Sequence, residues 1–295
     1  MREYEGDEGE RQEGWVMKVV CMTCMHHCSL EEGQRGICRA RKNEKGNIIC
    51  ENYGMATSLA LDPIEKKPLR RFRPGGMVLS VGSYGCNLRC PFCQNYEISM
   101  ADGEMAEETA GAAYLSPRWL ADKALECRPE GNIGVAFTYN EPLVGWEYVR
   151  DTGKLIKEAG MDNILVTNGS ASLEVLEKIL PYMDAMNIDL KGFREGYYKK
   201  LGGDLETVKR FIARAVKNCH VELTTLIVPG WNDTREEMEE EAEWIASLGR
   251  GIPLHVSRFF PQYHMRGTGA TEVKRVYELA ETARKYLKYV YTGNC

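Results

Sequence analysis

The 295-residue sequence lacks three features, and each absence excludes a class of protein. It has no apolar run long enough to span a membrane, so we expect neither a membrane protein nor a membrane partner. It has no excess of basic residues, because its formal net charge is −5 at pH 7, and a nucleic-acid partner is therefore not expected. Residues 1–14 are acidic and polar without an apolar core, which excludes a signal peptide and predicts a disordered acidic tail.

Cysteine is the residue type that stands out. The chain has 11 cysteines, and most of them are clustered. Without an export signal, this pattern indicates metal binding in the reducing cytoplasm rather than disulfides. The hydrophobic content of 43% and charged content of 27% are ordinary for a globular protein, and the length allows one core with a small second unit.

Three cysteines, Cys86, Cys90 and Cys93, lie within eight residues. Thiolates this close together can hold three irons of a cubane iron–sulfur cluster, which is normally bound by cysteine sulfur. With no fourth cysteine nearby, one iron keeps an open position for a substrate or cofactor. A zinc site that lacks its fourth ligand, and cysteines that only pack, are the alternatives.

A second group of cysteines comes earlier in the chain, at Cys21, Cys24, Cys28 and Cys38. Four thiolates are a common ligand set for structural zinc, so the sequence predicts a small metal-closed unit. A second iron–sulfur cluster and simple structural thiols are the alternatives. We assign residues 15–76 to this cysteine-rich unit and its linker, with a hairpin within 46–61 and an ordered segment at 62–69, where two prolines block regular structure.

From residue 77 to 295 the pattern alternates between apolar strands and amphipathic helices, which is typical of a parallel sheet. The predicted strands are 77–81, 133–139, 163–166, 185–190, 221–228 and 254–260, with a short seventh at 289–291. The predicted helices are 116–127, 143–159, 172–180, 205–217, 235–248 and 271–287. Six such units are fewer than the eight of a closed barrel. The predicted fold is therefore α/β, a partial (βα)6 TIM-like barrel with the small cysteine-rich unit before it.

Polar residues follow nearly every predicted strand. Ligands of parallel βα folds bind beyond the C-terminal strand ends, so these residues are expected to meet around one rim with the three-cysteine loop. The rim candidates on the second, third and fourth strands are Tyr139, Asn140, Glu141, Thr167, Asn168, Asp189 and Lys191.

Residues 85–95, Gly-Cys-Asn-Leu-Arg-Cys-Pro-Phe-Cys-Gln-Asn, resemble the signature of the radical S-adenosylmethionine (SAM) superfamily. They are similar to the branch related to pyruvate formate-lyase activating enzyme, in particular the AmmeMemoRadiSam group. The resemblance implies a [4Fe-4S] cluster whose open iron binds the amino and carboxylate groups of SAM. An injected electron then releases methionine and a 5′-deoxyadenosyl radical, which abstracts hydrogen from a substrate.

The resemblance also implies roles for the rim residues. Tyr139, Asn140 and Glu141 fall where the family places the motif that meets the SAM ammonium. Asp189 and Lys191 match a family motif that contacts the ribose and the SAM carboxylate. Two further sets complete the expected cofactor contacts: Phe92 beside the adenine, and Thr167 with Asn168 at the ribose, where Val166 replaces the family's aspartate.

The implied partners are SAM and an electron donor such as flavodoxin or ferredoxin, in an anaerobic or well-protected cell. Two substrate interpretations stay open: an activase that places a radical on a glycine of a partner protein, and an enzyme that modifies a peptide or small molecule with Memo-type and AMMECR-type partners. The rival hypotheses are an iron–sulfur electron carrier without catalysis and a zinc-binding scaffold protein.

Overall fold

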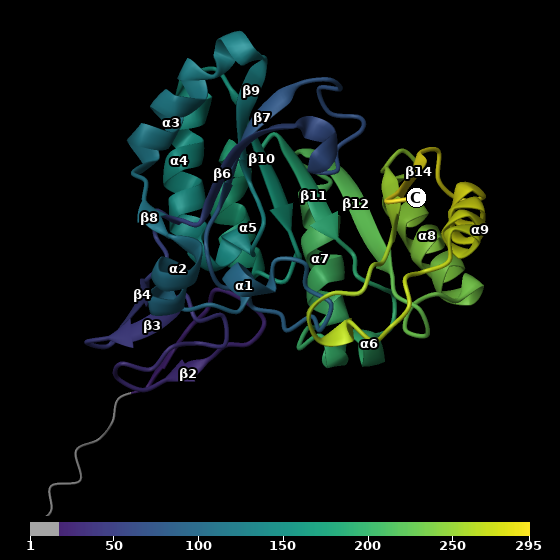
Figure 1. Cartoon of the computed structure of the whole chain (residues 1–295), viewed down its shortest axis with the longest axis horizontal. Helices are drawn as coiled ribbons and strands as arrows, with labels where there is room; N and C mark the ends of the chain where they lie inside the picture. The colour runs from purple at the N-terminus through teal and green to yellow at the C-terminus, as the bar shows by residue number, and fades with distance from the viewer. Residues whose placement is uncertain (1–17) are drawn as a thin grey trace, which may run out of the picture.

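The structure, a computed structural model, describes residues 18–295, so the predicted acidic tail at 1–14 lies outside the described residues. An eight-stranded sheet organises the fold, in the order β14-β13-β12-β11-β10-β9-β7-β6 (Figure 1). Its parallel strands are β7 (Met77–Gly82), β9 (Asn132–Phe137), β10 (Asp162–Thr167), β11 (Ala185–Asp189), β12 (His220–Ile227), β13 (Leu254–Arg258) and β14 (Val290–Gly293).

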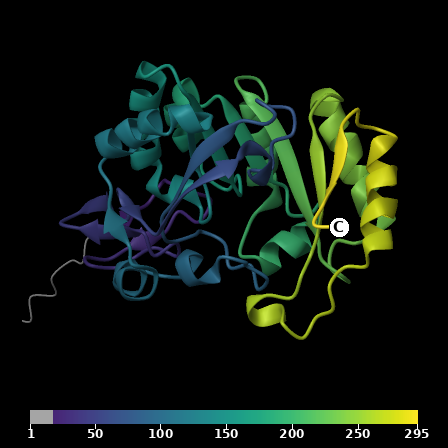
Figure 2. The same cartoon turned by 45° about the horizontal axis from the view of Figure 1, so that its top comes forward.

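Helices connect these strands and cover the outer face of the sheet (Figures 1 and 2). The main ones are α3 (Pro117–Glu126), α4 (Trp146–Glu158), α5 (Leu173–Ile179), α7 (Leu205–Ala215), α8 (Arg235–Gly249) and α9 (Val273–Arg284). Several begin at a side-chain cap: Ser116, Ser172 and Thr234 each accept a hydrogen bond from a backbone N–H of the first turn. No helix in the described part of the chain is both long and apolar enough to cross a membrane.

The predicted partial barrel is confirmed, including all six predicted strands and the short seventh. The sheet also has an eighth strand that we did not predict, β6 (Ser58–Pro63), which pairs antiparallel with β7. Its residues fell partly in the predicted hairpin and partly in the predicted linker, because its apolar alternation is weak and it ends in proline. Pro63 is tolerated because β6 is an edge strand.

The N-terminal cysteine-rich unit is built from short antiparallel pairs: β1 (Val19–Val20) with β2 (Ser29–Leu30), and β3 (Arg41–Glu44) with β4 (Asn47–Cys50). The hairpin therefore comes a few residues earlier than predicted. A third pair joins β5 (Met55–Ala56) to β8 (Ala113–Tyr114), beside α1 (Tyr96–Ser99) and α2 (Gly103–Ala110). Figures 1 and 2 place this unit at the end of the sheet where the parallel strands finish.

The opposite end of the sheet is held by Glu222, a fully buried carboxylate on β12. Its Oε1 accepts hydrogen bonds from the backbone N–H of Arg71 at 2.7 Å and from Nε2 of His220 at 2.9 Å. Its Oε2 accepts from the backbone N–H of Arg70 at 3.0 Å and from Nε2 of His255 at 2.6 Å. Glu222 thereby fixes the segment after β6 to two strands of the sheet. Burial raises the pKa of this carboxyl, but the four donors outweigh burial and lower the pKa to about 2.

We expect the substitution Glu222→Gln to lower the free energy of unfolding at pH 7 by about 3–5 kcal/mol. The substitution removes the charge from a buried network, and the amide N–H of the glutamine then faces groups that are themselves hydrogen-bond donors. Because the pKa of Glu222 is lower in the folded state, its carboxylate stabilises the fold at pH values above the unfolded-state pKa of about 4.5. This stabilisation is lost as the pH falls toward the folded-state pKa of about 2. The difference in the free energy of unfolding between variant and wild type, measured by urea unfolding, should therefore decrease as the pH falls from 4.5 to 2. The exposed ion pair of Glu177 with Arg214 supplies the control, Glu177→Gln, with an expected loss of about 0–1 kcal/mol. Equal losses in the two variants would contradict the assignment.

Candidate active site

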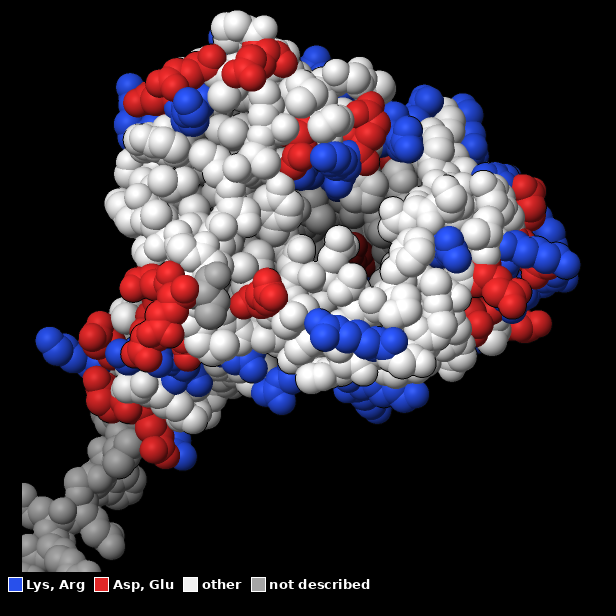
Figure 3. Space-filling view, in the orientation of Figure 1, with Lys and Arg blue, Asp and Glu red and all other residues white. Residues whose placement is uncertain are grey.

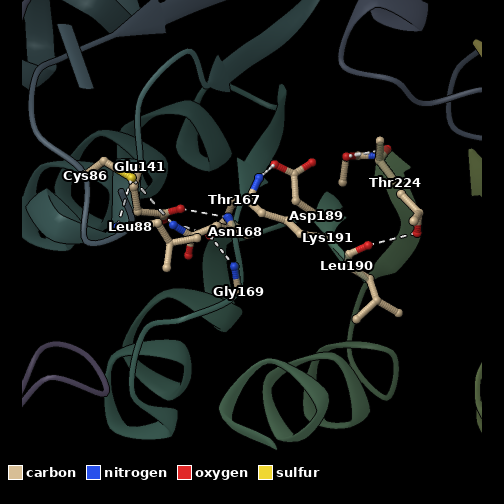
Figure 4. A network of polar contacts seen from close by, with 12 residues as sticks. Cys86, Leu88, Glu141, Thr167, Asn168, Gly169, Asp189, Leu190, Lys191 and Thr224 are labelled. Carbon is tan, nitrogen blue, oxygen red and sulfur yellow. Dashed lines mark hydrogen bonds and ion pairs between the residues drawn. The ribbon is translucent and has the colours of Figure 1, made fainter. Parts of the chain in front are cut away.

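The three cysteines of the loop at 86–93 lie directly after β7, at the C-terminal end of the sheet. Cys90 is buried, and Cys86 and Cys93 are partly buried. Burial raises the pKa of the Cys86 thiol well above its usual value, and the charges of Glu141, Cys90 and Cys93 raise it further. Burial also raises the pKa of Cys90 to about 11, against the opposing effect of Lys191. Figure 4 shows Cys86 beside Glu141, with Asp189 and Lys191 farther along the same network.

Asn140 braces the turn that leads into this loop. Its Nδ2 donates to the carbonyl oxygens of Tyr84 and Gly85, both at 3.0 Å, and its Oδ1 accepts from the backbone N–H of Ser83 at 3.1 Å. The resemblance placed Asn140 in the motif that meets the SAM ammonium, and in the structure its amide oxygen accepts a hydrogen bond from the protein's own backbone. Asn140 thus acts on the loop that carries the cysteines.

Gly85 allows the loop to approach the cysteine-rich unit closely. Its φ is +86°, and a Cβ built on it would lie 2.6 Å from the carbonyl oxygen of Cys38 and 3.0 Å from Cβ of Ala40. Both the backbone angle and the contact require glycine. Gly46 has a similar φ of +76° but has nothing within 4 Å of a Cβ.

We expect Gly85→Ala to destabilise the protein by roughly 1–3 kcal/mol more than Gly46→Ala, because only Gly85 adds a backbone clash to the cost of the left-handed conformation. Urea unfolding measures this difference. Because the clash displaces the start of the cysteine loop, the iron bound after reconstitution should also fall in Gly85→Ala alone. A Gly85→Ala protein as stable and as iron-rich as Gly46→Ala would contradict the close packing.

Glu141 joins the ends of two strands in the network shown in Figure 4. The side chain is 2% exposed. Its Oε1 accepts from Oγ1 of Thr167 at 2.7 Å and from the backbone N–H of Leu143 at 3.0 Å, and its Oε2 accepts from the backbone N–H of Asn168 at 2.7 Å. Burial is the main cause of its pKa of about 7, which these hydrogen bonds hold down. The predicted rim residues of β9 and β10 therefore meet at one carboxyl group.

Asn168 carries this network to the cysteine loop. Its Nδ2 donates to Oδ1 of Asn87 at 2.8 Å and lies 3.7 Å from Sγ of Cys86 (Figure 4). The backbone carbonyl oxygen of Asn87 lies 2.7 Å from Nε2 of His26, in the cysteine-rich unit. Sequence reasoning missed Asn87 and His26 as structural partners, although Asn87 stood inside the motif that identified the loop.

Asp189 and Lys191, at the end of β11, form an ion pair with Oδ2 and Nζ 2.8 Å apart. Burial lowers the pKa of Lys191, but Asp189 and Cys90 outweigh burial and raise it well above its usual value. Lys191 is therefore a fixed cation beside the cysteine loop.

The remaining two predicted residues have partners within the protein. Phe92 is buried and meets the rings of Trp231 and Phe259 edge-on, with centroids 6.4 and 6.3 Å away. Tyr139 has a φ of +74°, and its hydroxyl donates to Oδ2 of Asp62 on β6 at 2.8 Å. Its side chain thus joins the loop after β9 to the edge strand β6.

The N-terminal cysteines gather in the unit that packs against the loop. Cys21, Cys24 and Cys38 are buried and Cys28 is partly buried. Burial raises the pKa of Cys24 to about 12, and the charges of Cys38 and Cys21 add to this effect. A β-bridge between Cys24 and Ala171 joins the unit to the loop after β10.

No three His, Cys, Asp or Glu side chains within residues 18–295 converge on a position that would hold a single metal ion. A cubane cluster has a different requirement, because each cysteine binds its own iron. The donor set of Cys86, Cys90 and Cys93 fits such a cluster, because it supplies three thiols on one loop, and burial raises the pKa of two of them, Cys86 and Cys90.

Comparison with known proteins agrees with this site. The sequence profile of the radical SAM superfamily matches residues 80–245, more than half of the 295-residue chain and the part that holds the cysteine loop and the rim. The chain belongs to the radical SAM superfamily. This membership implies a [4Fe-4S] cluster and SAM as cofactors.

Two relatives illustrate the range of similarity within the radical SAM superfamily. An uncharacterized protein of Methanocaldococcus jannaschii is 39% identical over 284 residues, which cover 94% of this chain and 81% of the relative. The pyruvate formate-lyase-activating enzyme of Clostridium pasteurianum is 28% identical over 169 residues, which cover 56% of this chain and 67% of the enzyme.

Among solved structures, Streptococcus suis SuiB bound to S-adenosylmethionine superposes with a TM-score of 0.55 at 12% identity, covering 72% of this chain and 48% of SuiB. At this identity the similarity concerns the fold alone, and it agrees with the radical SAM partial barrel described above.

Proposed function

We propose that this protein is a radical SAM enzyme that reductively cleaves SAM at a [4Fe-4S] cluster bound by Cys86, Cys90 and Cys93. One observation carries the proposal: the cysteine loop, Glu141 and the Asp189–Lys191 pair all follow parallel strands of a partial βα barrel, at the C-terminal strand ends. An electron carrier without catalysis has no use for this polar rim, which favours the enzyme over the rival functions.

Each rim group suits one part of SAM. The carboxyl of Glu141 can accept from the ammonium group, and Lys191 can meet the carboxylate as a point charge. Asp189, Thr167 and Asn168 supply acceptors and donors for the ribose, and Phe92 supplies an apolar surface for the adenine. When bound, the cluster supplies the electron that breaks a C–S bond of SAM, while the protein binds, orients and excludes competing reactions.

The test is anaerobic. Reconstituted protein, with its iron and sulfide quantified, is mixed with dithionite and SAM, and the products are separated by liquid chromatography and mass spectrometry. We expect methionine and 5′-deoxyadenosine in equal amounts. Cluster-loaded protein that yields no 5′-deoxyadenosine above a SAM-only control would overturn the proposal, and zinc without iron in the purified protein would favour a scaffold.

For the substrate, we propose the two classes that the sequence raised: a glycine in a partner protein, as for a glycyl-radical activase, and a peptide or small molecule modified together with Memo-type and AMMECR-type proteins. Similarity to the activating enzyme supports the first class, and the loop motif supports the second. Deuterium transfer from a labelled candidate into 5′-deoxyadenosine distinguishes them.

We also propose that the N-terminal cysteines bind zinc or a second cluster, which would tie the unit together after these buried thiols lose their protons. Elemental analysis of the wild type and of Cys24→Ser decides between the two. A loss of zinc at constant iron indicates zinc, a loss of part of the iron indicates a second cluster, and no change in either metal contradicts both.

A further inference from the structure

Exposed cationic side chains lie in the cysteine loop and on two segments that contact it, although the chain as a whole is acidic. Arg89, inside the loop, is exposed, and no ion pair of it with residues 18–295 is present. The others lie on two neighbouring segments: Lys199 and Lys200 on α6 (Glu195–Lys200), and Arg266 after β13. Figure 3 shows lysine and arginine side chains on the part of the surface where α6 lies, below a hollow in the face of the molecule.

These cations belong to segments that contact the loop directly. The backbone N–H of Arg89 donates to the carbonyl oxygen of Leu201 at 2.8 Å, and that of His264 donates to the carbonyl oxygen of Pro91 at 2.9 Å. Beneath them, Cys90 packs in one apolar cluster whose other buried members are Leu88, Phe92, Tyr197, Leu201, Val228, Phe259 and Met265. The basic rim, defined as Arg89, Lys199, Lys200 and Arg266, therefore lies on the loop and on the two segments that contact it.

Little opposes the charge of this rim. Lys199 has an ion pair with Glu195, but at 3.7 Å and with both side chains largely exposed, so its charge is only weakly compensated. Lys200 lies over the ring of Trp231 at 5.0 Å, and Arg266 contacts the hydroxyl of Tyr96 at 3.4 Å. Neither contact is with a carboxylate, although the Tyr96 hydroxyl also donates to Oε1 of Glu97 at 3.3 Å.

The proposed reaction consumes one electron per SAM, and that electron comes from outside the protein. We propose that the basic rim is the docking surface for a small acidic one-electron carrier protein of the flavodoxin or ferredoxin class. The inference rests on the proposed function and assigns the electron donor to one surface. In the step, the carrier is oxidised by one electron and the cluster is reduced by one electron, and no atom is transferred between the proteins.

Charge complementarity makes the proposal measurable. Association of proteins with complementary charges reaches about 10⁸–10⁹ M⁻¹s⁻¹ at low salt, against about 10⁵–10⁶ M⁻¹s⁻¹ without steering. Salt weakens this acceleration, because it shortens the distance over which charges act on one another, to roughly 8 Å at physiological ionic strength. Reversing two rim charges should therefore slow reduction by the carrier, and the loss should shrink as salt is added.

The experiment compares two double variants of reconstituted protein with the same change in net charge. Lys200→Glu with Arg266→Glu reverses the rim, and Lys154→Glu with Lys217→Glu reverses two exposed cations on α4 and at the end of α7. Stopped-flow absorbance follows cluster reduction by flavodoxin hydroquinone, and in a second arm by reduced ferredoxin, at several salt concentrations. Dithionite, a small reductant, serves as the reference.

We expect the rim variant to be reduced by at least one carrier about tenfold or more slowly at low salt, with the gap closing at high salt, and the control variant to match the wild type. Reduction by dithionite should be unchanged in both.

Unchanged reduction of the rim variant by both carriers would overturn the proposal, and so would an equal slowing at every salt concentration. A rim variant that instead binds a polypeptide substrate less tightly, with normal reduction, would assign the surface to the substrate. Failure of the wild type to cleave SAM with dithionite would count against the proposed function and not against the docking surface.

Discussion

We expect Cys90→Ser to abolish the formation of 5′-deoxyadenosine from SAM. The substitution replaces one of three thiolate donors by a hydroxyl, which is a poor ligand for iron–sulfur clusters. Cys90 is also the buried member of the three, so water cannot easily reach the iron to replace the missing sulfur ligand. The measurement is anaerobic product analysis, together with the visible absorbance and iron content of the reconstituted variant.

Cys219→Ser provides the matched control for this prediction. Cys219 is a partly buried thiol before β12, and its Sγ lies 3.7 Å from the carbonyl oxygen of Ala215, a contact that serine can keep. We expect its iron content and product yield to match the wild type. Equal yields from Cys90→Ser and the wild type would remove the cluster assignment.

The second large effect is expected at Glu141. Glu141→Gln keeps the shape of the side chain but removes the negative charge that suits an ammonium group. It also places an amide N–H opposite hydrogen-bond donors, from which the carboxylate of the wild type accepts hydrogen bonds. A hydrogen bond to a charged group contributes about 1.5–3 kcal/mol, so we expect kcat/KM for SAM to fall roughly a hundredfold. Kinetics of 5′-deoxyadenosine formation across SAM concentrations measure the loss.

Glu241→Gln is the control, because Glu241 is another buried carboxyl but lies on α8, outside the rim. Oγ1 of Thr225 is bonded both to the carbonyl oxygen of Leu190, at 2.8 Å, and to Oε1 of Glu241. A hydroxyl has a single proton, so if Thr225 donates to Leu190, the carboxyl of Glu241 is protonated and donates in turn. Burial, which raises the pKa of Glu241 to about 8, agrees with this state. Glutamine keeps the neutral charge, and we expect unchanged kinetics. A similar loss in both variants would contradict the role of Glu141.

The sequence was informative where function follows from position along a strand. Glu141, Asp189 and Lys191 were predicted because polar residues after parallel strands meet at one edge, and the structure brings them to the cysteine loop. The partners of Asn140 and His26 were not predictable, since an amide or imidazole does not reveal which backbone group it will meet. β6 was missed for a different reason: an edge strand with one half-buried face carries little periodic signal.

The segment at 259–265 has a consequence for the surroundings of the cysteine loop. Phe259 and Met265 share an apolar cluster with Cys90, so the segment helps to keep water away from that sulfur. Tyr263 within the segment has a φ of +48°, a conformation that is costly for a residue other than glycine. A cluster held by Cys90 would therefore have an apolar, low-dielectric neighbour on this side, built from a segment that follows the sixth parallel strand.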